Sequence, residues 1–169
     1  VFIYPPIKFG STEKFTYPPM GILYIATYAK KMGLSVKFID SLIEGGTMEQ
    51  IAAKIVNENP KFVCFSVMTC QIHAGMKIAA RIKKLNKNIK IAFGGSHIAS
   101  TKEELFSFTN DIDYLMYGEA EKAFYELYNA KSEEDLLNIS GLIYKSGSKI
   151  KINPNVPIQD LDELPFPDL

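Results

Sequence analysis

Two short segments of the sequence place small, hydroxyl and imidazole side chains directly after predicted strands. Ser-Val-Met-Thr occupies positions 66–69 at the end of an apolar run, and Gly-Gly-Ser-His occupies positions 94–97 after a second such run. In an open parallel sheet, ligands bind at the carboxyl ends of the strands. Two consecutive glycines let a large flat or phosphate-bearing group approach the backbone without meeting a Cβ atom, whereas a simple turn needs only one. We therefore expect a ligand site at these two strand ends.

Several polar residues near the predicted strand ends have both a functional and a structural explanation. Ser66 and Thr69 are placed to contact a ligand, and they are equally suited to cap the following helix. His97 could contact a ligand, ligate a metal or begin a helix, and His73 is either the other candidate for an axial ligand or an exposed helix residue. Glu119 could accept a hydrogen bond from a ligand or complement a helix dipole. The residues alone leave these alternatives open.

Two common ligand-binding classes are disfavoured by what the strand ends lack. Asp40 ends the second predicted strand, where dinucleotide-binding domains place the acidic residue that binds ribose, but no Gly-x-Gly-x-x-Gly sequence follows the first strand. A phosphoacceptor receiver domain would need acidic residues after strand one and an aspartate after strand three, where this chain has Tyr-Pro-Pro at 4–6 and Ser66. We therefore expect neither a nicotinamide site nor a phosphoacceptor site.

The composition of the chain limits its size class and its partners. The 169 residues, 47% of them hydrophobic, predict one core-forming domain with a small extension. The formal net charge is zero and Arg81 is the only arginine, so we expect no nucleic-acid partner.

Two cysteines, Cys64 and Cys70, are too few for a four-thiolate iron–sulfur cluster. Without a signal peptide or an apolar segment of about 18 residues, we expect a cytoplasmic protein with no membrane partner. Because the first residue is Val1, we expect a piece of a longer protein.

Strand-like runs alternate with helical patterns along most of the chain. β-Branched and aromatic residues predict strands at 1–4, 35–39, 62–66, 90–93 and 114–117. Apolar residues at helical spacing predict helices at 21–32, 47–59, 71–85, 100–108 and from after Glu119 to about Asn129, with capping boxes at Thr47/Gln50 and Ser100/Glu103. Parallel strands need crossover connections, and these are overwhelmingly right-handed. We therefore expect an α/β fold with a doubly wound, parallel, five-stranded sheet of flavodoxin type, in the order 2-1-3-4-5.

The pattern changes near the end of the chain. Segments 141–145 and 149–152 flank Ser-Gly-Ser and predict an appended β-hairpin. The last residues contain several prolines among acidic and apolar side chains and show no periodicity, which is typical of a strap or linker. We expect a Rossmann-like domain at 1–138, the hairpin at 139–153 and a linker at 154–169.

In order and spacing, these segments resemble the amino-terminal cobalamin-binding domain of cobalamin-dependent radical S-adenosylmethionine enzymes, the group that contains the anaerobic magnesium-protoporphyrin IX monomethyl ester cyclase. The resemblance extends over nearly the whole chain. It is carried by Pro-Pro-Met-Gly at 18–21, Asp40, the segments 66–69 and 94–97, Gly118 with Glu119, Ile-Ser-Gly-Leu-Ile-Tyr at 139–144, and Leu-Asp-Glu-Leu-Pro-Phe-Pro at 161–167.

The chain departs from the general cobalamin-binding module at one point. That module has Asp-x-His-x-x-Gly after strand one, Ser-x-Leu after strand three and Gly-Gly after strand four. Here 66–68 match the second motif, with Met in place of Leu, and 94–95 match the third. The first motif is absent, and no histidine precedes His73. This departure is common in the radical enzymes that the chain resembles, and it concerns only how cobalt is ligated from below.

The resemblance implies a set of cofactor-binding residues but no catalytic residue and no protein ligand to a metal. The implied residues are Pro19, Met20, Gly21, Asp40, Ser66, Met68, Thr69, Gly94, Gly95, Ser96, His97, Tyr117, Gly118 and Glu119. Residues of the 66–69 segment would line the slot for the nucleotide tail of cobalamin, and those of the 94–97 segment would flank it. Gly118 and Glu119 would close its far side, and the loop 8–21 would lie near the corrin ring.

The resemblance also implies a larger enzyme. Cobalamin would bind to this chain, while a [4Fe-4S] cluster and S-adenosylmethionine would belong to a carboxyl-terminal radical S-adenosylmethionine domain of the same protein. The whole enzyme would carry out methyl transfer or an anaerobic oxidative cyclisation, and this chain alone would catalyse nothing.

The sequence allows two further interpretations of its function. In the first, the chain is a flavodoxin-like module for flavin or nucleotide, with Gly-Ser-Thr at 10–12 as the phosphate loop; however, no helix pattern begins there to form an anion site. In the second, the domain is structural and has lost its cofactor, because a fold alone does not guarantee a ligand. Binding of cobalamin, flavin or neither distinguishes the three.

Overall fold

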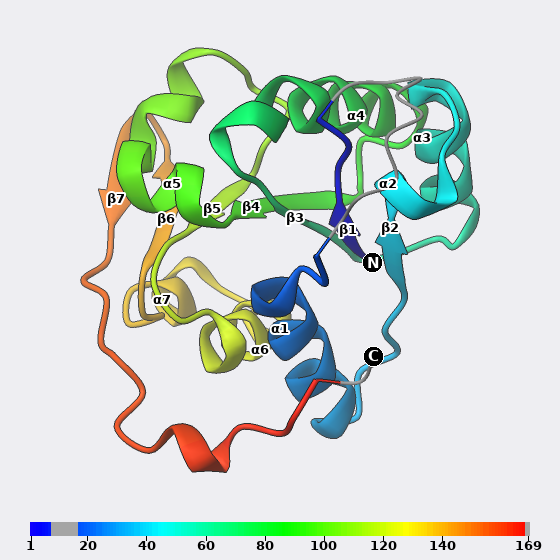
Figure 1. Ribbon diagram of the computed structural model, residues 1–169. Coiled ribbons are helices and arrows are strands. Elements are labelled where there is room, and N and C mark those ends of the chain that lie inside the picture. Colours follow the sequence, from blue (N-terminus) through cyan, green and yellow to red (C-terminus); the bar gives the residue numbers. More distant parts are fainter. Residues whose placement is uncertain (8–16, 168–169) are drawn as a thin grey trace.

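The computed structural model describes residues 1–7 and 17–167, which form a seven-stranded sheet between two layers of helices (Figure 1). The strands are β1 (Phe2–Tyr4), β2 (Phe38–Asp40), β3 (Phe62–Ser66), β4 (Lys90–Gly94), β5 (Tyr114–Met116), β6 (Leu142–Ser146) and β7 (Lys149–Ile152). The α-helices are α1 (Met20–Lys31), α2 (Ser41–Glu44), α3 (Met48–Asn57), α4 (Ile72–Leu85), α5 (Ser96–Thr101), α6 (Glu121–Asn129) and α7 (Glu133–Leu136). Short 3₁₀ helices are η1 (Thr69–Gln71), η2 (Lys102–Ser107) and η3 (Leu161–Glu163).

The strand order is β2-β1-β3-β4-β5-β6-β7, and β1 to β5 run parallel. This confirms the predicted α/β class and the order 2-1-3-4-5. The sheet has seven strands rather than the predicted five, because the predicted hairpin joins the sheet instead of forming a separate unit. Its strand β6 pairs antiparallel with β5, with Tyr114 opposite Tyr144, and β7 pairs with β6. The hairpin therefore continues the sheet and covers the edge that β5 would otherwise expose.

Helices cover both faces of the sheet (Figure 1), and each face has its own core. On one face, α3, α4 and α5 pack over a cluster that includes Val63 and Ile91. On the other face, α1 and α6 pack over a cluster that includes Phe62 and Ala92. Neighbouring residues of one strand enter different cores because successive side chains point to opposite faces. In the part of the chain that the structure describes, no helix is long and apolar enough to cross a membrane.

One of the two predicted capping boxes is present. The backbone N–H of Thr47 donates to Gln50 Oε1 at 2.8 Å, and the N–H of Gln50 donates to Thr47 Oγ1 at 3.3 Å, so α3 begins as predicted. The second box is wrong: α5 begins at Ser96, and the Ser100 hydroxyl donates to the Ser96 carbonyl at 3.1 Å. Gly95 has φ +97°, which turns the chain directly from strand into helix.

The segment 154–167, here called the strap, follows β7 and runs back past the α6 and α1 side of the molecule (Figure 1). Lys122 of α6 forms an ion pair with Glu163 at 2.6 Å. The N–H of Val156 donates to Ser140 Oγ at 2.8 Å. The first contact joins the strap to α6, and the second joins it to the loop before β6.

Candidate functional site

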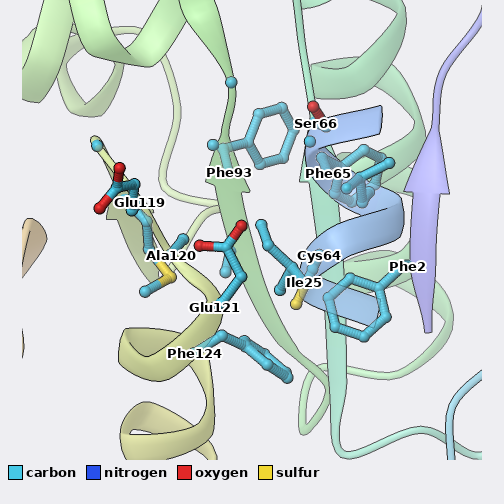
Figure 2. A pocket seen from close by; sticks show the side chains of 17 residues that line it. Phe2, Ile25, Cys64, Phe65, Ser66, Phe93, Glu119, Ala120, Glu121 and Phe124 are labelled. Atoms are coloured by element: carbon cyan, nitrogen blue, oxygen red, sulfur yellow. The ribbon is translucent and has the colours of Figure 1, made fainter. Parts of the chain in front are cut away.

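A cavity of about 290 Å³ lies at the carboxyl ends of β3, β4 and β5, on the face that α1 and α6 cover (Figure 2). We call it the α1/α6 cavity. Its apolar lining consists of Phe2, Ile22, Ile25, Cys64, Phe65, Ala92, Phe93, Met116, Ala120 and Phe124. Its glycines and polar residues are Gly21, Ser66, Gly94, Gly95, Gly118, Glu119 and Glu121. Apolar walls with a few placed polar groups are typical of sites for small molecules and cofactors.

Small residues at the ends of two adjacent strands keep the cavity open. Ser66 and Gly94 are register partners at the ends of β3 and β4. A Cβ atom on Gly94 would lie 3.4 Å from the Met116 carbonyl oxygen, which is an ordinary contact. Gly94 is therefore not required by local packing, and its missing side chain leaves space at the cavity.

Gly95 is a glycine for a different reason. Its φ of +97° lies in the region that favours glycine, and a Cβ atom would lie only 2.7 Å from Val67 O and 2.8 Å from Val67 N. The backbone of the neighbouring strand end therefore excludes any side chain at this position. The two consecutive glycines therefore have different roles. Gly94 leaves space at the cavity, and Gly95 allows the close approach of the Val67 backbone.

Only part of the predicted set lines the cavity. The residues that do are Gly21, Ser66, Gly94, Gly95, Gly118 and Glu119. Those that lie outside its lining are Pro19, Met20, Asp40, Met68, Thr69, Ser96, His97 and Tyr117. The cavity thus lies at the sheet edge where the sequence placed the site, but the sequence could not separate the side chains that reach the cavity from those beside it.

Asp40 has a structural partner. It is buried, and its Oδ1 accepts hydrogen bonds from the N–H groups of Leu42 at 2.9 Å and Ile43 at 3.3 Å. These bonds cap the short helix α2, which the sequence did not predict. Asp40 therefore stabilises the end of β2, away from the cavity lining.

Thr69 and His97 bring the two strand-end segments together beside the cavity. His97 Nδ1 lies 3.2 Å from Thr69 Oγ1, and the His97 N–H donates to the Val67 carbonyl at 3.2 Å. Met68 is 40% exposed and Met20, at the start of α1, is 43% exposed. These side chains border the carboxyl edge of the sheet from outside the cavity.

The far side of the cavity is joined to the strap. Glu119 accepts a hydrogen bond from the Ile158 N–H. Gly118 has φ +79°, and a Cβ atom there would lie 2.0 Å from Asn155 Oδ1. Tyr117 donates its hydroxyl hydrogen to the Asn153 carbonyl at 2.8 Å. The residues after β5 thus both border the site and anchor the chain that follows β7.

Glu121 is the functional candidate that sequence reasoning missed. It is the first residue of α6, it lines the cavity, and only 8% of its surface is exposed. Its Oε2 atom is buried and has no hydrogen-bond partner among the described residues. Burial raises the pKa of this carboxyl group above its ordinary value, and the charge of Glu119 adds to the effect. The available signal was a second acid two residues beyond Glu119.

Other candidates from the sequence contribute no second site. Cys64 is fully buried in the cavity wall, and burial raises the pKa of its thiol to about 12. His73 is exposed on α4. Within residues 1–7 and 17–167, no cluster of His, Cys, Asp and Glu could hold a metal ion. The phosphate loop at 10–12 of the flavodoxin-like alternative lies outside the described residues.

Comparison with known proteins connects this geometry with one family. The family described as "B12 binding domain" matches residues 9–128. A protein named uncharacterized methyltransferase PH0819, from Pyrococcus horikoshii, is 34% identical over 154 residues, which are 90% of this chain and 33% of that protein. The cobalamin-dependent radical SAM methyltransferase TokK from Streptomyces tokunonensis is 22% identical over 88% of this chain and 22% of its own length. The chain thus spans a third or less of these curated relatives.

Solved structures share the fold. The radical S-adenosylmethionine methyltransferase TsrM from Kitasatospora setae, with cobalamin and a [4Fe-4S] cluster bound, superimposes with a TM-score of 0.71 at 20% identity, over 97% of this chain and 30% of that chain. The apo structure of the cobalamin-dependent enzyme OxsB also gives a TM-score of 0.71, at 23% identity, over 88% of this chain and 21% of that chain.

Proposed function

The chain belongs to the B12-binding domain family, and from this premise we propose that it binds cobalamin with the nucleotide tail in the α1/α6 cavity and the corrin ring over the carboxyl edge of the sheet. The family match confirms the resemblance inferred from the sequence. The observation that carries the placement of the tail is a cavity with small residues at the strand ends and apolar residues along its walls.

The residues present fit the shape and polarity of the nucleotide tail. An aromatic base favours the apolar walls formed by Ile25, Cys64 and Phe124, because burial of its flat surface removes apolar area from water. The sugar and phosphate would pass Ser66 and Gly94, where no large side chain stands in the way. The Ser66 hydroxyl at this strand edge is available to them.

The corrin ring needs a broad, largely apolar surface beside the slot. Ile7, Met20 and Met68 are exposed at the end of β1, the start of α1 and the end of β3. Exposed apolar side chains that gather near a cavity often mark a binding surface. We assign the corrin to this surface. Thr69 and His97 would lie at its margin.

The role of this chain in the reaction would be to hold and orient the cofactor. Bound cobalamin would supply a cobalt centre suited to group transfer, as cofactors in general supply the difficult chemistry. Ser66 and Gly94 would admit the tail, the walls of the cavity would exclude water from it, and the exposed methionines would support the ring.

We further propose that the whole protein is a cobalamin-dependent radical S-adenosylmethionine methyltransferase. The support is the 34% identity with a protein named as a methyltransferase, together with the TokK and TsrM matches. A second domain would hold the [4Fe-4S] cluster and S-adenosylmethionine, and residues 154–169 would lead toward it. The substrate would be set mainly by that domain.

The proposal is tested by mixing the purified chain with hydroxocobalamin, removing free cofactor by desalting, and recording the visible spectrum. We expect corrin absorbance to remain with the protein near one equivalent. Flavin mononucleotide, treated in the same way, should be lost. Retention of flavin without cobalamin would favour the flavodoxin-like alternative, and retention of neither would favour a domain without cofactor.

A further inference from the structure

Glu121 is a buried acid in an otherwise apolar part of the α1/α6 cavity. Its carboxyl group points into the space between Ala120, Ile25 and Cys64 (Figure 2). Only 8% of the residue is exposed, and Oε2 has no hydrogen-bond partner in the part of the chain that the structure describes. A buried polar atom without a partner costs free energy, so such an atom in a cavity lining calls for an explanation, and a bound ligand is one.

The protein compensates this carboxyl group only in part. The ion pairs found among the described residues do not include Glu121. Among the residues that line the cavity, the other titratable groups are Glu119, which is also acidic, and Cys64, whose pKa of about 12 keeps it neutral. The helix start stabilises one side of the carboxyl group, because backbone N–H groups of Ala120 and Glu121 face it. The remaining oxygen faces the cavity.

We propose that Glu121 forms a hydrogen bond with the ring nitrogen of the aromatic base at the end of the cobalamin tail, and so selects corrinoids that carry such a base. This rests on the proposed cobalamin function. One proton is shared between the two groups: an ionised carboxylate accepts it from a protonated ring nitrogen, or a protonated carboxyl donates it to a neutral one. No bond to carbon forms or breaks.

Because Glu121 lies deep in the cavity, we expect it to contact the base rather than the sugar or phosphate of the tail. The sugar and phosphate are strongly hydrated and would lie near the strand ends at Ser66 and Gly94. Cys64 lies two residues further into the sheet along β3, and Figure 2 shows the Glu121 carboxyl group near that level. The base is the part of the tail that gains from the apolar walls there. Its free ring nitrogen is the polar atom that would need a partner.

The test compares cobalamin with cobinamide, which has the corrin ring but lacks the nucleotide tail. Dissociation constants are measured by fluorescence quenching or calorimetry for the wild-type chain and for Glu121→Leu and Glu121→Gln. We expect Glu121→Leu to weaken cobalamin binding about 10-fold to 100-fold, the range for a hydrogen bond to a charged group. Glu121→Gln should lose less, because its amide still offers a hydrogen bond. Binding of cobinamide should change less than about 3-fold in both variants, because it has no group that reaches Glu121.

Glu126→Gln is the matched control. It removes the same charge from the same helix, but Glu126 is exposed and lies outside the cavity lining. We expect its affinity for both corrinoids to equal that of the wild type. Thermal unfolding without cofactor provides a second readout: Glu121→Leu should not lower Tm, because a leucine in this apolar space needs no partner.

The results separate the Glu121 contact from the cobalamin function. A selective loss for cobalamin with an unchanged Tm supports the contact between Glu121 and the base. Equal losses for cobalamin and cobinamide, or no loss for either, would overturn this contact while leaving the cobalamin function intact. A wild-type chain that binds neither corrinoid would overturn both.

Discussion

The two faces of the sheet are built from the same strands but packed in different ways. On β4, Ile91 and Phe93 belong to the core under α3 and α4, whereas Ala92 belongs to the core under α1 and α6. On β3, Val63 and Phe65 belong to the first core, and Phe62 and Cys64 belong to the second. Toward the carboxyl ends, large residues therefore face one side and small residues face the other. The α1/α6 cavity is the space that the small residues leave.

The face under α4 is tightly packed at the same level of the sheet. The rings of Phe65 and Phe93 stack with their centroids 4.5 Å apart. Gly75 of α4 packs against the Phe93 ring and Val67, because a Cβ atom there would be 3.0 Å from Phe93 Cε1 and 3.2 Å from Val67 Cγ1. Large side chains thus fill one face at this level, whereas small residues leave a cavity on the other. Substitutions on the two faces should therefore have opposite effects on stability and binding.

The largest expected effect on stability comes from shortening a side chain on the packed face. Ile91→Ala should lower the free energy of unfolding by about 2–5 kcal/mol, because Ile91 is fully buried and the surrounding core cannot close the hole. Urea unfolding followed by circular dichroism measures the change. Cobalamin binding should persist in the folded fraction. A loss below about 0.5 kcal/mol, the range of surface substitutions, would contradict this view of the packed face.

Enlarging Ala92, the neighbour of Ile91 on β4, should weaken cobalamin binding strongly and change stability little. Ala92→Ile places a large side chain in the cavity, so we expect at least about a tenfold loss of cobalamin affinity, or about 1.4 kcal/mol. The free energy of unfolding should change by less than about 1.5 kcal/mol, because the new atoms enter existing space. Ala80→Ile, on the exposed side of α4, is the control and should leave binding unchanged. Full cobalamin affinity in Ala92→Ile would place the tail elsewhere.

The sequence predicted the sheet because alternating strand and helix patterns determine its topology. It also predicted a site at the carboxyl ends of the strands, because the ends of parallel strands meet there, and the α1/α6 cavity lies at this edge. It did not predict the walls of the cavity, since Phe2 and Phe124 lie far apart in the sequence and meet only after α6 packs on the sheet; their rings are 5.0 Å apart. Asp40 shows the other limit: an acid at a strand end fits a ligand site and a helix cap equally well, and only the fold separates the two.

Two glycines provide a smaller test of the same contrast. Alanine normally stabilises a helix by up to about 1 kcal/mol relative to glycine. Gly75→Ala should instead destabilise the protein by about 1 kcal/mol, because overpacking against the stacked rings outweighs that gain. Gly21→Ala on α1 should stabilise it by a few tenths of a kcal/mol, because no atom lies within 4 Å of the new Cβ. Parallel urea titrations measure both, and equal effects at the two sites would remove the distinction between the faces.

The smallest expected effect is a pH dependence of the free energy of unfolding that comes from Glu121 in the α1/α6 cavity. Burial raises the pKa of Glu121 in the folded state above its ordinary value of 4.5. Between the two pKa values the folded state binds more protons than the unfolded state, so the contribution of Glu121 to stability is fully present below about 4.5 and is lost as the pH rises through the folded pKa. Glu121→Gln lacks this dependence. Its free energy of unfolding relative to wild type should therefore increase with pH across this window and stay constant above it.

Of the other titratable groups lining the cavity, Cys64 stays neutral, with a pKa of about 12, and Glu119 is common to both proteins. A difference that does not vary with pH would mean that the cavity is wet enough to solvate the carboxylate, which would also remove the reason for Glu121 to need a partner from the ligand.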